Sequence, residues 1–258
     1  MSPMSPRTLR PRASGFDPRS VGGLKLWLDA ANTSSMTFNG STVSQVNDLS
    51  GNGFHATQGT ANNQPAYQAT GFNSKPTLYF DSTDSLLSSG TIAELVLTPT
   101  ASPGFALVMA CYMPAFSSGG NISFGSDVVA NGRIYFSSHF DLGGGNRSIF
   151  FDVVNATTGR ISSGSQTDTG WTSPHIFTAY RFGSAMAVRR NGTVLASRAD
   201  ASGNFSATTA KFLLGKAFDL AATQMYMSEC VIYAASLSGS QITTIERGLA
   251  KKWGITLA

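Results

Sequence analysis

Short runs of alternating apolar and polar residues recur along most of this chain, and turn motifs separate them. The first run, LKLWLDA at 24–30, places a leucine at every second position and hence on one face of an extended strand. Comparable runs lie at 76–81, 104–113, 121–125, 133–138, 148–154, 175–182, 185–197, 211–218 and 224–234. Asn191-Gly192 is the strongest hairpin signal, because a type I′ turn needs positive φ at both central positions. Many short strands with regular turns predict an all-β sandwich or barrel.

The composition agrees with many strands and little exposed helix. Only 12% of the residues are charged while 41% are hydrophobic, so the polar surface consists mainly of Ser, Thr, Asn and Gly. These residues suit exposed strands and turns better than long solvent-exposed helices. The chain has 258 residues and no internal repeat, and we predict one large domain over residues 23–258.

One helix is predicted near the end of the chain. Its apolar residues are three or four positions apart and share one face: Ile242, Ile245, Leu249 and Trp253. Ser238 or Ser240 is expected to cap its start, and Gly254 to end it. We expect this helix to pack on a sheet and close the domain. A shorter helical turn is predicted within 91–97.

Residues 1–22 differ from the rest of the chain. Four prolines interrupt any helix and apolar residues are sparse, which predicts an extended arm without its own core. The arm is basic, since Asp17 alone opposes four arginines: Arg7, Arg10, Arg12 and Arg19. We interpret it as an arm that binds a neighbouring protein; a solvated tail and a contact with nucleic acid are the alternatives. The rest of the chain has no basic face with interleaved aromatics, so no nucleic-acid partner is expected for the domain.

The sequence lacks the features of two further classes, a membrane-spanning protein and a protein with a secretory signal peptide. No run of eighteen apolar residues exists, so no membrane span is expected. A secretory signal peptide has a hydrophobic segment behind its basic N-terminus, and no such segment follows the basic N-terminus here.

Cys111 and Cys230 both lie in apolar, strand-like runs, and we expect buried free thiols; a disulfide between them is the alternative.

Residues for hydrolysis are sparse as well. A retaining glycosidase needs two carboxyl groups about 5–5.5 Å apart, and the three glutamates, Glu94, Glu229 and Glu246, are far apart in the sequence. No Gly-x-Ser-x-Gly elbow accompanies the neighbouring His139 and Asp141. The glycine-rich stretch 143–146 lacks the Lys-Ser/Thr of a phosphate loop. We therefore expect a protein that is not an enzyme.

Three stretches are informative together: LKLWLDA…VNDLSGNGFHATQ…KPTLYFDSTDSL, HIFTAYRF…AVRRNGTVLAS and MSECVIYAASLSGSQITTIERGLAKKWGI. Their order and spacing, over about residues 24–256, resemble the concanavalin A-like (laminin G-like) domains of phage virion and bacterial surface proteins. The resemblance implies two antiparallel sheets packed face to face as a jelly roll. We expect this sandwich, with the short C-terminal helix and the extended N-terminal arm. Such domains bind sugars, bind proteins or fasten virions together, so the resemblance implies an architecture and no particular ligand.

Two acidic stretches are candidates for a calcium site. Asp48 and Asn52 lie in VNDLSGNG, and Asp81 and Asp84 lie in FDSTD. Calcium takes carboxylate, amide and carbonyl oxygens as ligands, and the domains that the chain resembles sometimes carry such a site. The alternative is a tight turn in each stretch, because Asp and Asn bond their own backbone. No other cofactor is expected.

Sugar binding would need an exposed aromatic ring flanked by amide or carboxylate groups. Trp171, in the loop-like stretch DTGWTSP, is the best candidate, and packing in the interior is its alternative. The loop at 141–147 offers Asp141 and Asn146 as ligand-binding residues. The loop at 200–206 is a further candidate.

Two functions follow from these features. The first is a non-enzymatic virion structural protein, a capsid decoration or cement protein or a tail-associated one. It would be present in many copies or as a homo-oligomer on the virion surface, and fastened to other virion proteins by residues 1–22. The alternative is a receptor- or carbohydrate-binding module of a phage tail or surface appendage, with a host glycan as its ligand. An enzyme acting on polysaccharide is the third hypothesis.

Overall fold

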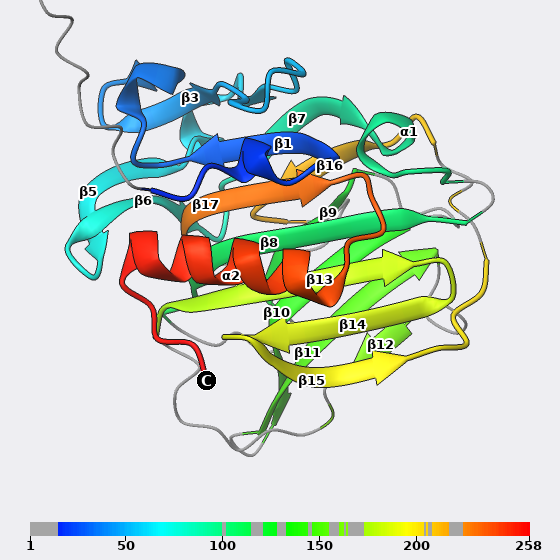
Figure 1. Ribbon diagram of the computed structural model, residues 1–258. Helices are drawn as coiled ribbons and strands as arrows, with labels where there is room; N and C mark the ends of the chain where they lie inside the picture. The colour runs from blue at the N-terminus through cyan, green and yellow to red at the C-terminus, as the bar shows by residue number, and fades with distance from the viewer. Residues whose placement is uncertain are drawn as a thin grey trace, which may run out of the picture.

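The computed structural model describes residues 15–99, 102–114, 121–127, 133–143, 146–154, 160–162, 164, 173–203, 205, 208–216 and 224–258. Over these residues the chain forms strands β1 to β17, and every pairing between them is antiparallel. The strands lie in two layers, and helix α2 (Gly239–Trp253) lies across the outer face of the front layer (Figure 1). The predicted two-sheet antiparallel sandwich with a short C-terminal helix is confirmed.

The front sheet is the layer that carries α2. Its strands are β1 (Leu24–Asp29), β5 (Ala66–Phe72), β6 (Lys75–Asp81), β8 (Gly104–Tyr112), β13 (His175–Phe182), β14 (Ala185–Arg190), β15 (Thr193–Arg198) and β17 (Gln224–Tyr233). Strand β17 lies inside this sheet. One of its edges pairs with β8, and the other pairs first with β6 and then with β1. The first strand of the chain and the last are therefore neighbours.

The back sheet runs in the order β2, β3, β4, β7, β16, β9, β10, β11, β12. Its strands are β2 (Met36–Asn39), β3 (Thr42–Val46), β4 (Ala56–Thr57), β7 (Leu86–Thr91), β9 (Asn121–Ser126), β10 (Arg133–Gly143), β11 (Asn146–Val154), β12 (Arg160–Ser162) and β16 (Lys211–Leu214). The two sheets join at one corner, where Thr42 of β3 pairs with Ala66 of β5. A short helix, η1 (Pro18–Ser20), precedes β1, and three others connect strands: η2 (Thr33–Ser35), η3 (Ala61–Asn63) and α1 (Ile92–Leu95).

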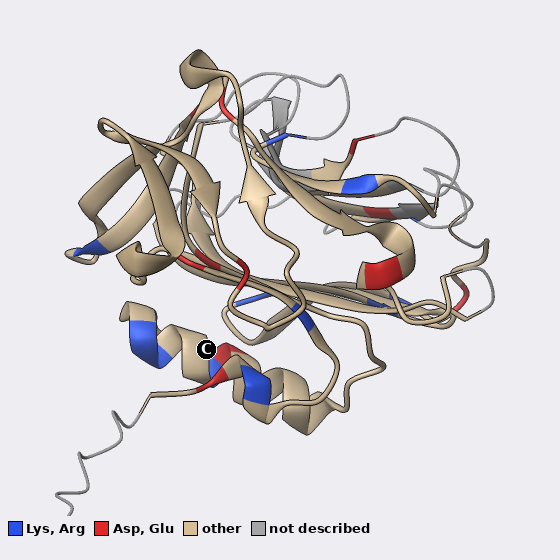
Figure 2. Ribbon diagram, turned by 90° about the horizontal axis from the view of Figure 1, so that it is seen from above, with Lys and Arg blue, Asp and Glu red and all other residues tan. Residues whose placement is uncertain are grey.

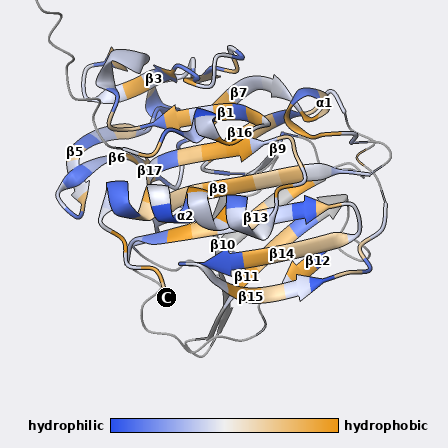
Figure 3. Ribbon diagram, viewed as in Figure 1, coloured by the Kyte–Doolittle hydropathy of each residue, from blue (hydrophilic) through white to orange (hydrophobic). Residues whose placement is uncertain are grey.

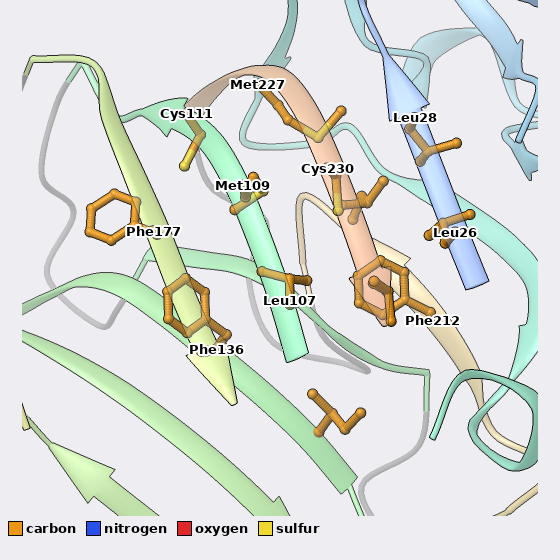
Figure 4. Packing of buried hydrophobic residues seen from close by; sticks show 14 of the residues in the cluster. Leu26, Leu28, Leu107, Met109, Cys111, Phe136, Phe177, Phe212, Met227 and Cys230 are labelled. Carbon is orange, nitrogen blue, oxygen red and sulfur yellow. The ribbon is translucent and has the colours of Figure 1, made fainter. Parts of the chain in front are cut away.

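The main core fills the space between the two sheets. Inward-facing side chains from both layers meet there, among them Leu26, Leu28, Leu107, Met109, Cys111, Phe136, Phe177, Phe212, Met227 and Cys230 (Figure 4). All ten are fully buried. Alternate residues of a strand point to opposite faces, so each strand contributes every second residue to this core.

Strand β8 is buried on both faces. Leu107 and Met109 point into the main core, whereas Ala106 and Val108 belong to a second core under α2. This explains why its sequence, GFALVMACY, is a continuous apolar run and not an alternating one. Strands β17 and β14 of the same sheet also contain apolar segments (Figure 3).

Helix α2 begins and ends where the sequence predicts. Ser238 and Gln241 form a capping box: the Ser238 hydroxyl accepts a bond from the Gln241 amide, and the Gln241 side chain accepts one from the Ser238 amide. Gly254 ends the helix with a φ of 67°, a left-handed conformation that favours glycine. The apolar face of α2, which ends at Trp253, packs on the outer face of the front sheet.

Three smaller predictions are also confirmed. Asn191 and Gly192 form the β14–β15 turn with φ values of 49° and 85°. The helical turn expected within 91–97 is α1. Cys111 and Cys230 are buried free thiols, and burial raises the pKa of both.

The described part of the N-terminal segment, residues 15–22, lies on the sandwich. Phe16 packs against α2 at Gly248, where a Cβ atom would lie 2.1 Å from the ring. The Tyr233 hydroxyl donates a 3.0 Å hydrogen bond to the carbonyl of Pro18. Arg19 pairs with Asp17 at 2.9 Å and its guanidinium lies 5.4 Å from the centre of the Trp27 ring. The predicted arm residues Arg7, Arg10 and Arg12 lie outside the described residues.

No helix in the described part of the chain is long and apolar enough to cross a membrane.

Candidate functional site

A buried ionic cluster fastens the end of α2 to the front sheet. Glu229 of β17 is 1% exposed and accepts hydrogen bonds from Trp27 Nε1 and Trp253 Nε1, both at 2.6 Å. Lys252 Nζ donates to Glu229 and to Asp29, both at 2.7 Å. Burial raises the pKa of Glu229, and Lys252 opposes that rise. Both carboxylate oxygens of Glu229 are already hydrogen-bonded, which indicates a structural role.

A second ionic cluster holds the middle of α2. Glu246, also 1% exposed, accepts a 2.8 Å bond from Thr178 of β13. Arg189 of β14 donates to both Glu246 oxygens, at 2.8 and 2.9 Å. A bidentate pair of this kind fixes orientation as well as distance. Charged residues are sparse on the described ribbon, and several of them lie on α2 or beside it (Figure 2).

The first pair of predicted calcium ligands forms a tight turn. Asp48 Oδ1 accepts bonds from the backbone amides of Trp27 and Ser50, both at 2.9 Å. Asp48 Oδ2 accepts from the Ser50 hydroxyl at 2.7 Å and from a backbone amide at 3.1 Å. The Asn52 side-chain amide donates to the carbonyl of Lys25 at 3.1 Å. These bonds connect the loop to β1.

The second pair, Asp81 and Asp84, also bonds within its own loop. Asp84 is 4% exposed and accepts a 3.0 Å bond from the Asp81 amide. Burial, with a smaller contribution from the Asp81 charge, raises the pKa of Asp84 to about 6. No group of three or more His, Cys, Asp or Glu side chains suited to a metal is found among the described residues. The calcium site remains a prediction.

The residues predicted to bind sugar are not assembled into a described site. Trp171 lies outside the described residues. Asp141 lies near the end of β10 and Asn146 starts β11, so the backbone brings both to one hairpin. Their side chains lie outside the described part of the structure, and their role remains a prediction.

A cavity of about 230 Å³ opens at the end of the front sheet where β13 turns into β14. The described residues that line it are Ser102, Pro103, Arg181, Gly183, Ser184, Ala201, Ser202 and Gly203. Its three serines are exposed, while Pro103, Arg181 and Ala201 are buried. The cavity therefore has a rim of hydroxyl groups and a floor that contains one guanidinium. We call it the Arg181 cavity.

Arg181 is held below the rim by backbone carbonyls. Its Nε donates to the carbonyl of Gly183 at 2.8 Å, and its Nη2 donates to that of Gly203 at 2.7 Å. Nη1 is buried and has no hydrogen-bond partner among the described residues. Burial, and next the charge of Arg198, lower the pKa of Arg181. Arg181, a residue that lines the cavity, thus keeps one strong donor without a partner among the described residues.

The sequence itself contains a signal for Arg181. Phe177 and Ala179 point into the main core, and Arg181 follows at the next position of the same face. An arginine at the end of an inward-facing apolar series is unusual, because a buried charge needs a partner. The loop at 200–206, which was a candidate from sequence, supplies Ala201, Ser202 and Gly203 to the same cavity.

A larger cavity of about 350 Å³ lies at the other end of β13. It is lined by His175, Arg190, Asn191, Thr193, Leu195, Thr256, Leu257 and Ala258. The Asn191 side-chain amide lies 2.9 Å from His175 Nδ1, and the Asn191 carbonyl accepts a bond from the Ala258 amide at 2.9 Å. These contacts join polar groups of His175, Asn191 and Ala258 to one another. We take the smaller Arg181 cavity as the candidate ligand site.

The chain matches no protein-family model and no curated protein. Solved structures with the same fold include the binding domain of paraclostridial mosquitocidal protein 1 (TM-score 0.62, 13% identity, 93% of this chain covered). Domain 4 of AbnA, an extracellular GH43 arabinanase from Geobacillus stearothermophilus, was solved with arabinotriose (0.59, 15%, 86%). The botulinum neurotoxin serotype D binding domain is a third (0.60, 13%, 91%).

The coverage of these structures differs. The present chain spans 98% of AbnA domain 4, but only 56% and 54% of the mosquitocidal and botulinum chains. At these identities the likeness shows the fold alone. The domain is thus a β-sandwich of the architecture found in these binding domains.

Proposed function

We propose that this protein is a non-catalytic binding module that holds a carbohydrate in the Arg181 cavity. The observation that carries the proposal is the donor of Arg181 that is unpartnered in the described part of the chain, on a buried residue that lines a cavity with a serine rim. Sites that bind polar ligands place a few convergent donors and acceptors in a concave surface. The fold supports the proposal, because one structure that shares it holds arabinotriose and two are the binding domains of a mosquitocidal protein and a botulinum neurotoxin.

The size and chemistry of the cavity suit binding without reaction. Its volume of about 230 Å³ is below the roughly 300–1,000 Å³ of common small-molecule pockets, so one terminal residue of a larger ligand fits best. None of the eight described lining residues is Asp or Glu. Most glycoside hydrolases use two carboxyl groups, one as the general acid and one as the nucleophile or base. We therefore propose recognition of a glycan and not its cleavage.

Filling the cavity is expected to abolish this binding. Ser202→Phe places an aromatic ring at the rim. Glycan-array signals of the full chain should then fall at least about tenfold, because a loss of about 1.4 kcal/mol in binding free energy lowers the affinity tenfold. Thr193→Phe is the matched control: it adds the same ring at an exposed residue of the other cavity and should leave binding unchanged. Binding that survives Ser202→Phe but is lost in Thr193→Phe would place the ligand in the other cavity, at the opposite end of β13, and would contradict the proposal. An array without any signal would contradict the function itself.

We also propose that residues 1–14 fasten the domain to other virion proteins, so that many copies display the cavity on a particle. Phe16 on Gly248 and the bond from Tyr233 to Pro18 support this proposal. They hold residues 15–22 on the domain, so any segment before them starts from a fixed point beside α2.

Removal of residues 1–14 is expected to abolish incorporation into particles and to leave the melting temperature unchanged, because the deletion retains every described residue of the two cores. The measurement is the amount of protein that cosediments with particles, compared with a variant in which a Gly/Ser segment of equal length replaces residues 1–14. Equal incorporation of all three proteins would exclude the arm as the attachment.

A further inference from the structure

We propose that the group bound at Arg181 is an anion, the carboxylate or sulfate of an acidic sugar. This inference rests on the proposed carbohydrate-binding function and names the class of its ligand. A neutral sugar could use the open donor equally well by geometry. The charge of the cavity decides between the two classes.

Arg181 carries a buried positive charge that no described carboxylate neutralises. The residue is 2% exposed, and its guanidinium donates to two neutral carbonyls, those of Gly183 and Gly203. Taking an unpaired ion out of water costs several kcal/mol even after the protein relaxes. The free chain accepts this cost, and a bound anion recovers part of it. A neutral hydroxyl recovers less, since bonds between charged groups are about twice as strong as neutral ones.

The surroundings of the cavity increase its positive potential. Arg198 is close enough to lower the pKa of Arg181. The ion-pair partner of Arg198 is Asp200, at 2.8 Å, and the Asp200 side chain is 79% exposed and screened by water. Two guanidinium groups thus lie near one cavity whose described lining has no acid. A negative ligand fits this field.

The rim completes a site for an oxyanion. Ser102, Ser184 and Ser202 are exposed and line the same cavity, and serine hydroxyls can donate to the remaining oxygen of a carboxylate or to the remaining oxygens of a sulfate. The φ values of Gly183 and Gly203, 61° and 82°, shape the two turns that hold Arg181 from either side. The sugar ring would extend from the rim toward solvent.

The test compares charged and neutral forms of one sugar. Calorimetry of the full chain with glucuronate, glucose 6-sulfate and methyl β-glucoside should show the glucoside bound at least about tenfold more weakly than one of the two anions, because a charge-assisted bond is lost. The stronger of the two anions identifies the group. Equal affinity for all three sugars would overturn the inference, and this comparison needs no variant.

A matched pair of variants tests the position. Ser184→Asp places a carboxylate at the rim, where it pairs with Arg181 and competes with the ligand; we expect at least about tenfold weaker binding of the anion. Ser184→Asn has the same shape without the charge and should bind within about threefold of wild type. Equal weakening by both variants would overturn the inference, and melting curves check that both fold.

The two levels of the proposal fail in different ways. Binding of inorganic sulfate that Ser184→Asp abolishes, without binding of any of the three sugars and with a silent glycan array, retains the anion site and removes the carbohydrate-binding function. Neutral glycans that bind equally to wild type and Ser184→Asp retain the function and remove the anion. Binding of neither probe removes both.

Discussion

Lys252→Met is expected to destabilise the domain by about 3–5 kcal/mol at pH 8, the cost of removing one partner from a buried ion pair. Glu229 is 1% exposed in the structure. Without Lys252, its carboxylate keeps only the hydrogen bonds from the indole groups of Trp27 and Trp253. Asp29 loses the same lysine. Two carboxylates then lie under the end of α2 without a cation.

The loss should depend on pH in a defined direction. The pKa of Glu229 in the folded protein is raised by burial, and Lys252 lowers it, so the variant raises it further. A raised carboxyl pKa contributes stability that is complete below the unfolded value of about 4.3 and is lost as pH rises through the folded pKa. The destabilisation should therefore be largest at pH 8 and shrink toward pH 4.

Urea unfolding at several pH values measures this effect. Lys251→Met is the control, because Lys251 is exposed on the same helix and its replacement should cost less than about 0.5 kcal/mol. Adding Glu229→Gln to Lys252→Met should restore part of the stability at pH 8. A small loss that does not vary with pH would show that Glu229 is already neutral in the folded protein.

Phe177→Ala should cost about 3–5 kcal/mol, which is the range for emptying a large aromatic site in a core. Phe177 is fully buried between the sheets, and its ring packs edge-on against Phe136 at 6.1 Å and against His175 at 5.6 Å. The surrounding strands are hydrogen-bonded on both edges and cannot collapse into the void. For a domain of this size the melting temperature should fall by about 6–20 °C.

Phe38→Ala is the matched control for this core variant. Phe38 is 42% exposed on β2 and makes an edge-on contact with Tyr67 at 5.5 Å, so the same atoms are removed from a site that water can enter. Its loss should be less than half that of Phe177→Ala. Equal losses would contradict the assignment of the main core, and thermal unfolding decides between the two results.

Local patterns predicted the elements of this fold well. Alternation located most strands, and the Asn191-Gly192 turn and the capped helix at 239–253 needed only short-range chemistry. Other features depended on partners that are distant in sequence. The pairing of β17 with β1, β6 and β8 follows from the assembled sheet and not from any local signal.

The candidate site was harder to predict than the fold. The loop at 200–206 was a candidate from its composition, but Arg181 lay unnoticed inside a strand pattern. Its importance depends on three facts that only the structure supplies: the face it occupies, the two carbonyls that hold it, and the open Nη1 atom. The turns at Asp48 and Asp84 show the reverse case, in which residue types suited to a metal also bond their own loops.

The place of β17 inside the front sheet has a consequence for synthesis on the ribosome. Strands β1, β6 and β8 emerge early, but the strand that joins them begins at Gln224. Until that segment leaves the exit tunnel, the growing polypeptide presents unpaired edges and the apolar stretch of β8, which are features that promote aggregation. The nascent chain therefore has to be kept apart from its neighbours for most of translation, and closure of the sheet comes as a late step between distant segments.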